Sequence, residues 1–222
     1  MCGRYALTAD SGQIAQWFDL EEPPMVSVRY NVAPSQLVAV VGLKPGGLRR
    51  GLVLMRWGFV PRWSKDPNSG PKPINAKSET IATNAAFRTS FRDRRCLIPM
   101  TGFYEWDRRE GKKQPYHFRT LPEPTAFASI WDLWYGPTEP LYTCAIITVA
   151  ANDVVEPYHD RMPAILRKDH FDTWLCTTAT VGELQSLLRP FPADELGSRA
   201  VSPTVNSAKN DGLECLESAS LF

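Results

Sequence analysis

The second residue of the chain is a cysteine, in the opening segment Met1-Cys2-Gly3-Arg4-Tyr5. Cys2 and Gly3 are both small, so an aminopeptidase can remove Met1, and Cys2 would then carry a free amine and a thiol on adjacent carbons. The reference pKa of an α-amine is about 7.7–8.0, against about 10.4 for lysine, so roughly a tenth of this amine is nucleophilic at pH 7. Such an amine condenses with an aldehyde to give an imine, and the thiol can close on the imine carbon to form a thiazolidine. The alternative is an ordinary buried cysteine that does no chemistry.

Of the three histidines, His159 is placed most like a site residue, because it lies in the polar segment YHDRMP at 158–163 after a strand-like run. The alternative is a loop histidine bonded to Asp160. His117 alternates with apolar residues along a predicted strand, and His170 lies on a predicted surface helix.

Glu105 stands in GFYEW, flanked by three aromatic residues. Burial there would raise the pKa of its carboxyl and let it move protons near neutral pH, whereas an outward-facing position on the strand would leave it without that role. Asn75, in PINAKSET, follows a proline-rich loop, where its amide could orient a carbonyl group or cap a helix.

Basic and aromatic side chains beside turns indicate a nucleic-acid partner. Residues 1–95 hold 14 Lys and Arg against 7 Asp and Glu, although the whole chain has a net charge of only +1. Such an asymmetry is typical of a polyanion-binding face, unless folding intermixes the two halves on the surface. Trp63 lies in a polar loop and could stack on bases, whereas Trp57 and Trp106 have the setting of core residues. The candidate phosphate ligands are Arg4, Arg29, Arg62, Lys77 and Arg161.

Several function classes lack support in the sequence. No phosphate-binding glycine loop, zinc-protease motif or carboxylate cluster is present, so we expect no metal and no cofactor. The five cysteines are widely spaced with no CxxC pair, which is typical of reduced thiols in a cytosolic protein. The apolar runs are too short to span a bilayer, and the N-terminus has no secretory signal, so we expect a cytoplasmic chain that does not bind membranes.

Hydrophobic periodicity predicts many short strands and a few helices. We expect one α+β domain over residues 1–222, with a mainly antiparallel, β-barrel-like sheet core and peripheral helices. A loop is expected at 61–73, which holds four prolines. The predicted helices are 8–20, 78–87, 168–176 and 181–188, and the predicted strands are 37–42, 52–57, 95–99, 102–106, 116–119, 126–133 and 142–150.

The motifs, taken in order, resemble the SOS-response-associated peptidase family. No single one is diagnostic, but their order over nearly the whole chain is specific. The matching segments are MCGRY at 1–5, RYNVAPS at 29–35, RWGFVPRW at 56–63, INAKSET at 74–80, RRCLIPMTGFYEW at 94–106, ASIWDLW at 128–134, IITVAAN at 146–152 and HDRMP at 159–163.

The resemblance implies a protein that cross-links covalently to abasic sites in single-stranded DNA and needs no metal. It implies a β-barrel-like core and a basic DNA groove, and we expect a monomer associated with the bacterial nucleoid. The family's catalytic positions fall on Cys2, Asn75, Glu105 and His159. The peptidase activity in the family name is best read as removal of Met1, by the protein itself or by an aminopeptidase, and the imine could also lead to β-elimination, a lyase activity.

DNA contacts implied by the resemblance fall on Arg4 and Arg161, which would bind phosphates, and on Pro34 and Trp63, which would wedge against the lesion. Lys77 replaces the arginine that the family usually has, which keeps the charge but loses the planar fork. Ser64 stands where some members have a second aromatic residue, which predicts a weaker wedge. Two other functions stay open at this point: a cysteine peptidase acting on other proteins, with His159 as base, and a non-catalytic reader of modified DNA.

Overall fold

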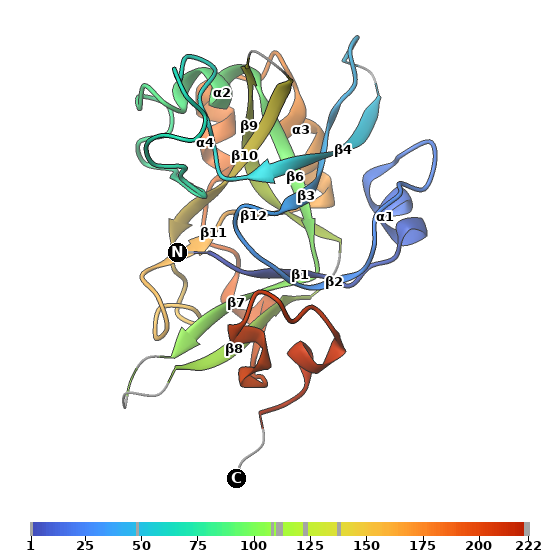
Figure 1. The fold of residues 1–222 in the computed structure, drawn as a ribbon, viewed down its shortest axis with the longest axis vertical. Coiled ribbons are helices and arrows are strands. Elements are labelled where there is room, and N and C mark those ends of the chain that lie inside the picture. The colour runs from blue at the N-terminus through green and yellow to red at the C-terminus, as the bar shows by residue number, and fades with distance from the viewer. Residues whose placement is uncertain are drawn as a thin grey trace.

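The computed structural model describes residues 2–47, 49–107, 109, 113–121, 124–136 and 139–219. Five strands close into a barrel (Figure 1). β10 pairs in parallel with β4 and antiparallel with β9, and the ring is completed by antiparallel β4–β3, β3–β6 and β6–β9 pairs. The barrel strands are β3 (Leu37–Leu43), β4 (Arg50–Trp57), β6 (Arg95–Met100), β9 (Thr125–Tyr135) and β10 (Pro140–Ala150).

Three short strands are attached to the barrel. β5 (Asn75–Lys77) pairs in parallel with β10, and β11 (Arg161–Pro163) pairs antiparallel with β10. β12 (Ile165–Arg167) pairs antiparallel with β9. β10 therefore binds segments of the chain that are more than eighty residues apart in sequence.

A second, fully antiparallel sheet has the strand order β13-β8-β7-β1-β2. β7, β8 and the C-terminal segment lie below the barrel in Figure 1. The bounds of the strands are Tyr5–Leu7 for β1, Arg29–Val32 for β2, Gly102–Asp107 for β7, Gln114–Thr120 for β8 and Leu196–Ala200 for β13.

The helices are short and peripheral. Helix α1 (Ser11–Phe18) begins with a capping box, in which Asp10 and Gln13 each accept a hydrogen bond from the other's backbone N–H. The other α-helices are α2 (Arg88–Asp93), α3 (Phe171–Leu175) and α4 (Val181–Leu187), and 3-10 turns cover Lys168–His170, Ala193–Glu195, Pro203–Asn206 and Leu213–Leu216. Within the described residues, no helix combines the length and hydropathy that are needed to cross a bilayer.

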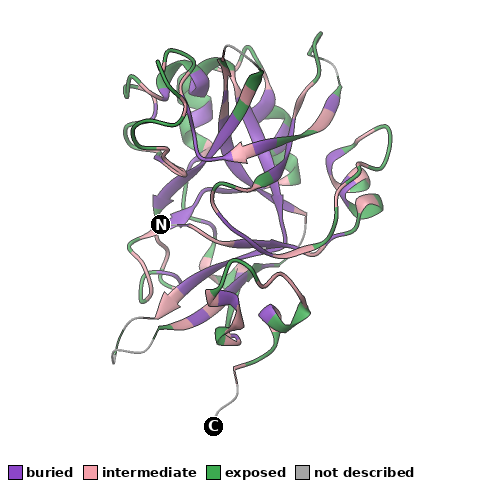
Figure 2. Ribbon diagram, viewed as in Figure 1, coloured by how far each residue is buried: buried purple, intermediate pink, exposed green. Residues whose placement is uncertain are grey.

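The two sheets share one core, in which aromatic rings make the contact between them. Tyr5 of the five-stranded sheet packs edge-on against Trp57 and Phe127 of the barrel, at centroid distances of 5.6 and 5.5 Å. All three residues are buried, and buried residues line the inner strands throughout (Figure 2). Aromatic pairs of this geometry stabilise a fold beyond the area that they bury, so β1 is held firmly against the barrel.

The α+β prediction with a barrel-like core is confirmed. The predicted helix at 78–87 is wrong, because this segment forms consecutive turns before α2 begins at Arg88. Its hydrogen bonds mix i→i−3 and i→i−4 spacing, and the Asn84 side chain accepts from the N–H of Ala86. Polar side chains that bond the local backbone compete with helix formation.

Asn31 in β2 is the hub that holds the C-terminal segment on the sheet. It is fully buried, and its Nδ2 donates to the carbonyl oxygens of Val205, Ser207 and Asn210 at 3.2, 2.9 and 2.6 Å. Its Oδ1 accepts from Nη1 of Arg4 at 2.7 Å. The two N–H bonds of this amide are therefore shared among three backbone carbonyls, and its oxygen accepts from one guanidinium.

Replacing Asn31 by alanine should destabilise the protein by about 2–3 kcal/mol, because buried carbonyls lose their donor. The free energy of unfolding, measured by urea denaturation, checks this expectation. Lys209→Ala, at an exposed position in the same segment, serves as the control and should cost less than about 0.5 kcal/mol. Equal stability of the two variants would contradict the role of Asn31.

Candidate active site

Cys2 and Glu105 are brought together by the pairing of β1 with β7. The register is Tyr5 opposite Phe103 and Ala6 opposite Gly102, and the N–H of Tyr104 donates to the carbonyl of Arg4. Because the strands are antiparallel, the chain runs back from Tyr5 to Cys2 as β7 runs forward from Phe103 to Glu105. Glu105 is 5% exposed and Cys2 is fully buried.

The Cys2 thiol is held in its protonated form. Burial raises its pKa well above the usual value, and the negative charge of Glu105 raises it further. Both effects disfavour a thiolate. Cys2 is therefore a neutral thiol at pH 7, and it needs a base to accept its proton when sulfur forms a bond.

Asn75 lies at the start of β5, opposite Ile146 of β10. Both side-chain atoms, Oδ1 and Nδ2, are buried, and neither has a hydrogen-bond partner in the described part of the chain. A buried amide without partners costs roughly 1–3 kcal/mol per group. An unsatisfied amide at this position therefore has the properties of a ligand-binding group.

His159 immediately precedes β11, and its Nδ1 accepts a hydrogen bond from the N–H of Arg161 at 2.9 Å. This bond places the proton of the neutral imidazole on Nε2. The carboxylate of Asp160 lies 2.8 Å from the same Nδ1, so a protonated imidazole would donate to Asp160 instead. His159 is thus a loop histidine beside Asp160, as the predicted alternative had it. Its side chain is also 30% exposed, so a ligand can reach it.

Aromatic packing joins the His159 segment to the strands that carry Glu105. The rings of Tyr158 and Tyr116 lie 4.5 Å apart, and Tyr116 is the cross-strand partner of Glu105. β10 separately joins Asn75 to β11, because Ile146 pairs with Asn75 and Ala150 pairs with Arg161. The fold thus links the regions that hold the four predicted catalytic residues.

The predicted phosphate ligands have different surroundings. Arg161 donates from Nη1 and Nη2 to the Glu79 carboxylate at 2.5 and 2.9 Å, and from Nη2 to the carbonyl of Thr148. Arg4 is tied inward, with Nη1 donating to Asn31 and to the carbonyl of Val205. Lys77 is exposed on β5. The fork of Arg161 is therefore already occupied by Glu79, and Lys77 is the best placed of these three side chains for an external phosphate.

Trp63 is 67% exposed in the loop after β4. The loop is held by β9: the buried Asp132 accepts from the N–H and Nε of Arg62 at 3.0 Å each, and Nε1 of Trp134 donates to the carbonyl of Ser64 at 2.7 Å. A large apolar ring is thus presented to solvent from a fixed base. Pro34 is half-buried in the turn between β2 and β3, where Ser35 has a φ of 70°.

The exposed Glu79 and the buried Asp132 are two residues beside the candidate phosphate ligands that the sequence reasoning did not single out. Both lie inside segments that match the family, INAKSET and ASIWDLW, and this location is the sequence signal that could have pointed to them. Their roles depend on which arginine each carboxylate meets, and only the folded chain shows that Glu79 pairs with Arg161 and Asp132 with Arg62.

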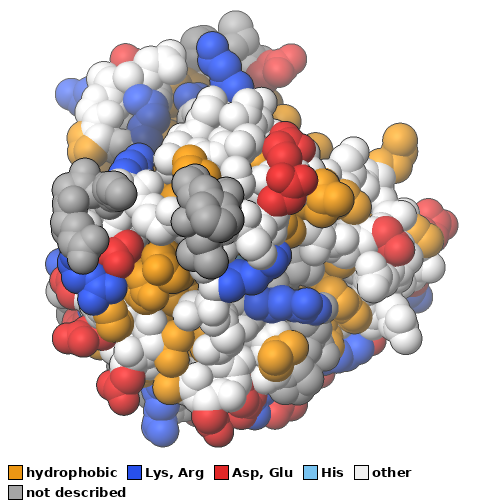
Figure 3. Space-filling model, turned by 90° about the horizontal axis from the view of Figure 1, so that it is seen from below, with side chains coloured by type: hydrophobic (Ala, Val, Ile, Leu, Met, Phe, Trp, Pro, Cys, Tyr) orange, Lys and Arg blue, Asp and Glu red, His pale blue; other side chains and the backbone are white. Residues whose placement is uncertain are grey.

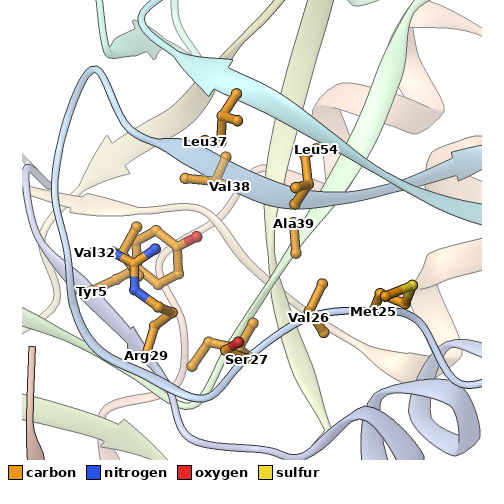
Figure 4. Close-up of a pocket in the computed structure, with 11 residues that line it drawn as sticks. Tyr5, Met25, Val26, Ser27, Arg29, Val32, Leu37, Val38, Ala39 and Leu54 are labelled. Atoms are coloured by element: carbon orange, nitrogen blue, oxygen red, sulfur yellow. The ribbon is translucent and has the colours of Figure 1, made fainter.

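Charge and cavities help to delimit the site. On the face seen from below, basic and acidic side chains are intermixed (Figure 3). A pocket of about 240 Å³ between the segment before β2 and strands β3 and β4 has mostly apolar walls (Figure 4), and none of the four candidate catalytic residues lines it. In the described residues, no group of His, Cys, Asp and Glu side chains could hold a metal ion.

The family model of the SOS response associated peptidase (SRAP) matches residues 1–208. The chain belongs to this family. Abasic site processing protein YoqW of Bacillus subtilis is 39% identical over 98% of this SRAP chain and 100% of its own, and YoaM of the same organism is 40% identical over 98% of both. A solved structure from Bacteroides thetaiotaomicron, at 22% identity, superposes with a TM-score of 0.89 over 99% of this chain and all of that one. This last likeness shows the fold alone.

Replacing Glu105 by glutamine should lower the pKa of the Cys2 thiol, because it removes a neighbouring negative charge that disfavours the thiolate. Burial remains, so the pKa should stay above that of a free cysteine. Alkylation of Cys2 at pH 8, followed by peptide mass spectrometry, should be at least about threefold faster than in the wild type. Asp107→Asn, two residues further along β7, is the control and should leave the rate unchanged; equal rates in both variants would contradict the coupling.

Proposed function

We propose that this SRAP chain captures abasic sites in single-stranded DNA by a covalent bond to Cys2. The observation that carries the proposal is the placement of Cys2 beside the buried Glu105. The unsatisfied amide of Asn75 and the names of the two relatives, which are abasic site processing proteins, support it. An abasic sugar in its open form is an aldehyde, which is the reactant that an amine and a thiol on adjacent carbons would trap.

The reaction requires loss of Met1, because the nitrogen of Cys2 is otherwise an amide and not a nucleophile. The free amine adds to the aldehyde and releases one water to give an imine. The S–H bond then adds across the C=N bond, with sulfur bonded to carbon and the proton transferred to nitrogen. Since the thiol is held protonated, the amine attacks first, and Glu105 would carry the thiol proton to the nitrogen.

The remaining residues would bind and orient the damaged strand. Asn75 would hydrogen-bond the sugar through its free amide, and His159 would present its Nε2–H to a sugar oxygen or a phosphate. Lys77 would bind a phosphate directly, and Arg161 would do so by exchanging the Glu79 carboxylate for phosphate oxygens. Arg4 would fix the segment that follows Cys2. Trp63 and Pro34 would occupy the gap left by the missing base.

Two further activities follow from the same intermediate. The imine can undergo β-elimination of the 3′ phosphate, which is a lyase reaction, if the thiol does not close the ring first. Opening of the thiazolidine, with Glu105 as the acid, would release the DNA. Removal of Met1 by the protein itself would use Cys2 and Glu105, and an aminopeptidase could do the same.

A cysteine peptidase acting on other proteins would need Cys2 as a thiolate. Burial and the charge of Glu105 both raise the pKa of this thiol. The electrostatics therefore favour the aminothiol trap over a thiolate-based peptidase.

Cys2→Ala keeps the terminal amine but removes the thiol, so the imine can form and the ring cannot. With an abasic oligonucleotide, the variant should lose the heat-stable adduct at least about a hundredfold, yet an adduct should appear after borohydride reduction of the imine. Denaturing gels and intact-mass measurement check both results. Cys176→Ala is the matched control, and a tagged form that retains residues before Cys2 should form neither adduct. A heat-stable adduct formed by the tagged protein would contradict the proposal.

Asn75→Leu should separate stability from function. Replacing an unsatisfied buried amide by an apolar side chain of similar size should raise the free energy of unfolding by about 1–2 kcal/mol. The rate of adduct formation should fall at least about tenfold, because the sugar loses a hydrogen-bonding partner. Urea denaturation and single-turnover cross-linking measure the two effects, and a variant that is less stable but equally fast would show that Asn75 is structural.

A further inference from the structure

The pocket of about 240 Å³ shown in Figure 4 takes no part in the chemistry proposed for Cys2. One of its walls is the segment before β2, and the other is formed by strands β3 and β4. Met25 is fully exposed at the rim, and Leu37 and Leu54 are about half exposed. An apolar hollow that is open to solvent is typical of a binding site.

The hydroxyl group of Tyr5 points into this pocket (Figure 4). Tyr5 is 1% exposed, and its ring packs against Trp57 and Phe127. Its hydroxyl makes no hydrogen bond with any described residue. Burial raises the pKa of this hydroxyl well above its usual value, so it is a neutral phenol that can donate one hydrogen bond and accept others. Because buried hydroxyl groups usually have a partner, this one predicts a polar atom of a ligand.

Arg29 lines the same pocket, and its positive charge acts on the Tyr5 hydroxyl. Its Nε donates to the carboxylate of Asp211, and its Nη2 donates to Oε1 of Gln36 at 2.8 Å. Its Nη1 has no hydrogen-bond partner in the part of the chain that the structure describes. Asp211 already compensates the charge of Arg29, so this predicted phosphate ligand is better suited to donate to a neutral polar atom.

The size and the walls of the pocket favour a small flat ring. Its volume is below the range of about 300–1,000 Å³ that is typical of pockets for drug-sized ligands. A nucleobase has apolar faces and an edge of donors and acceptors, which matches two apolar walls with polar groups at one end. An aliphatic side chain of a peptide would leave the Tyr5 hydroxyl without a partner.

Arg56 places a second guanidinium group on the face of the β3–β4 hairpin that lines the pocket. It lies opposite Leu37, so the two side chains share one face of the hairpin. Leu54, two residues before Arg56, faces the same side. The Arg56 side chain is half-buried and makes no hydrogen bond or ion pair with the described residues. A phosphate next to a base in the pocket would therefore find an uncompensated cation.

We propose that this pocket binds an undamaged nucleobase of the single strand whose abasic site reacts at Cys2. Tyr5 and Arg29 would hydrogen-bond the edge of the base, and Arg56 would bind a neighbouring phosphate. The pocket is close to the expected wedge, because β2 and β3, which contribute to its walls, are joined by the turn that holds Pro34. The inference rests on the proposed function, since the ligand is the same DNA strand.

The test follows the methyl signals of the wild-type protein by NMR while an undamaged single strand of about eight nucleotides is added. The ring current of a stacked base should move the methyl signals of Val26, Leu37 and Leu54 upfield. Val53 is exposed and does not line the pocket, so its signals should not move.

Four variants test the residues that would hold the base. Tyr5→Phe keeps the ring and removes only the hydroxyl, so it should raise the dissociation constant of the strand at least about threefold. Tyr135→Phe, at an exposed tyrosine outside the pocket, is the matched control and should leave this constant unchanged. Arg56→Gln should lower the salt slope of binding by about 1. Ala39→Leu, which narrows the cavity, should abolish the methyl shifts.

Three results would overturn the proposal: methyl signals of the pocket that stay in place when the strand binds, an unchanged affinity in Tyr5→Phe, or a deoxynucleoside monophosphate that binds as tightly as the strand. Cross-linking of abasic DNA by the wild-type protein is measured separately. An adduct without methyl shifts would contradict only the base pocket, whereas methyl shifts without an adduct would contradict only the proposed function.

Discussion

The site depends on the pairing of β1 with its two neighbours. An N-terminus usually frays, but here β1 lies between β7 and β2 and is packed by Tyr5 against the barrel. Cys2 lies three residues before the start of this strand, so the pairing of β1 with its neighbours also fixes the position of Cys2. Without that anchor, the negative charge of Glu105 would not act on the Cys2 thiol. In the proposed chemistry, a terminal Cys2 held in this way would lose little entropy on forming a bond, and a central strand would suit that role.

β10 organises the other half of the site. Its pairing with β5 and β11 links Asn75 to Arg161 and His159, which come from distant parts of the sequence. The cost of this arrangement is an amide with no partner in the described residues. Proteins retain such groups where binding needs them, because an apolar replacement would be more stable but could not hydrogen-bond a ligand. In the proposed site, the stability of the fold and the capacity to bind the sugar would thus be opposed at Asn75.

The sequence predicted the long elements better than the short ones. The β3–β4 hairpin and strands β9 and β10 have long apolar runs, and their extents differ from the prediction by only a few residues. β5 and β11, three residues each, have no periodicity of their own and exist because β10 offers free edge groups. The segment 78–87 reads as a helix by composition, but its side chains bond the local backbone instead. The family motifs indicated the candidate site residues. The ion pair between Arg161 and Glu79 could be seen only in the folded chain, because the two residues are far apart in the sequence.

Burial also controls which cysteines react with general thiol reagents. Cys176 is partly exposed, and its hydrogen bond with Thr178 lowers its pKa, so general thiol reagents should find it first. Cys2 is buried and has a raised pKa, which protects it from oxidation and alkylation. In the proposed chemistry this protection has no cost, because the terminal amine makes the first bond and the thiol adds only after an imine lies beside it. Selectivity for an aldehyde would then come from withholding the thiolate, mainly through burial of Cys2 and in addition through the negative charge of Glu105.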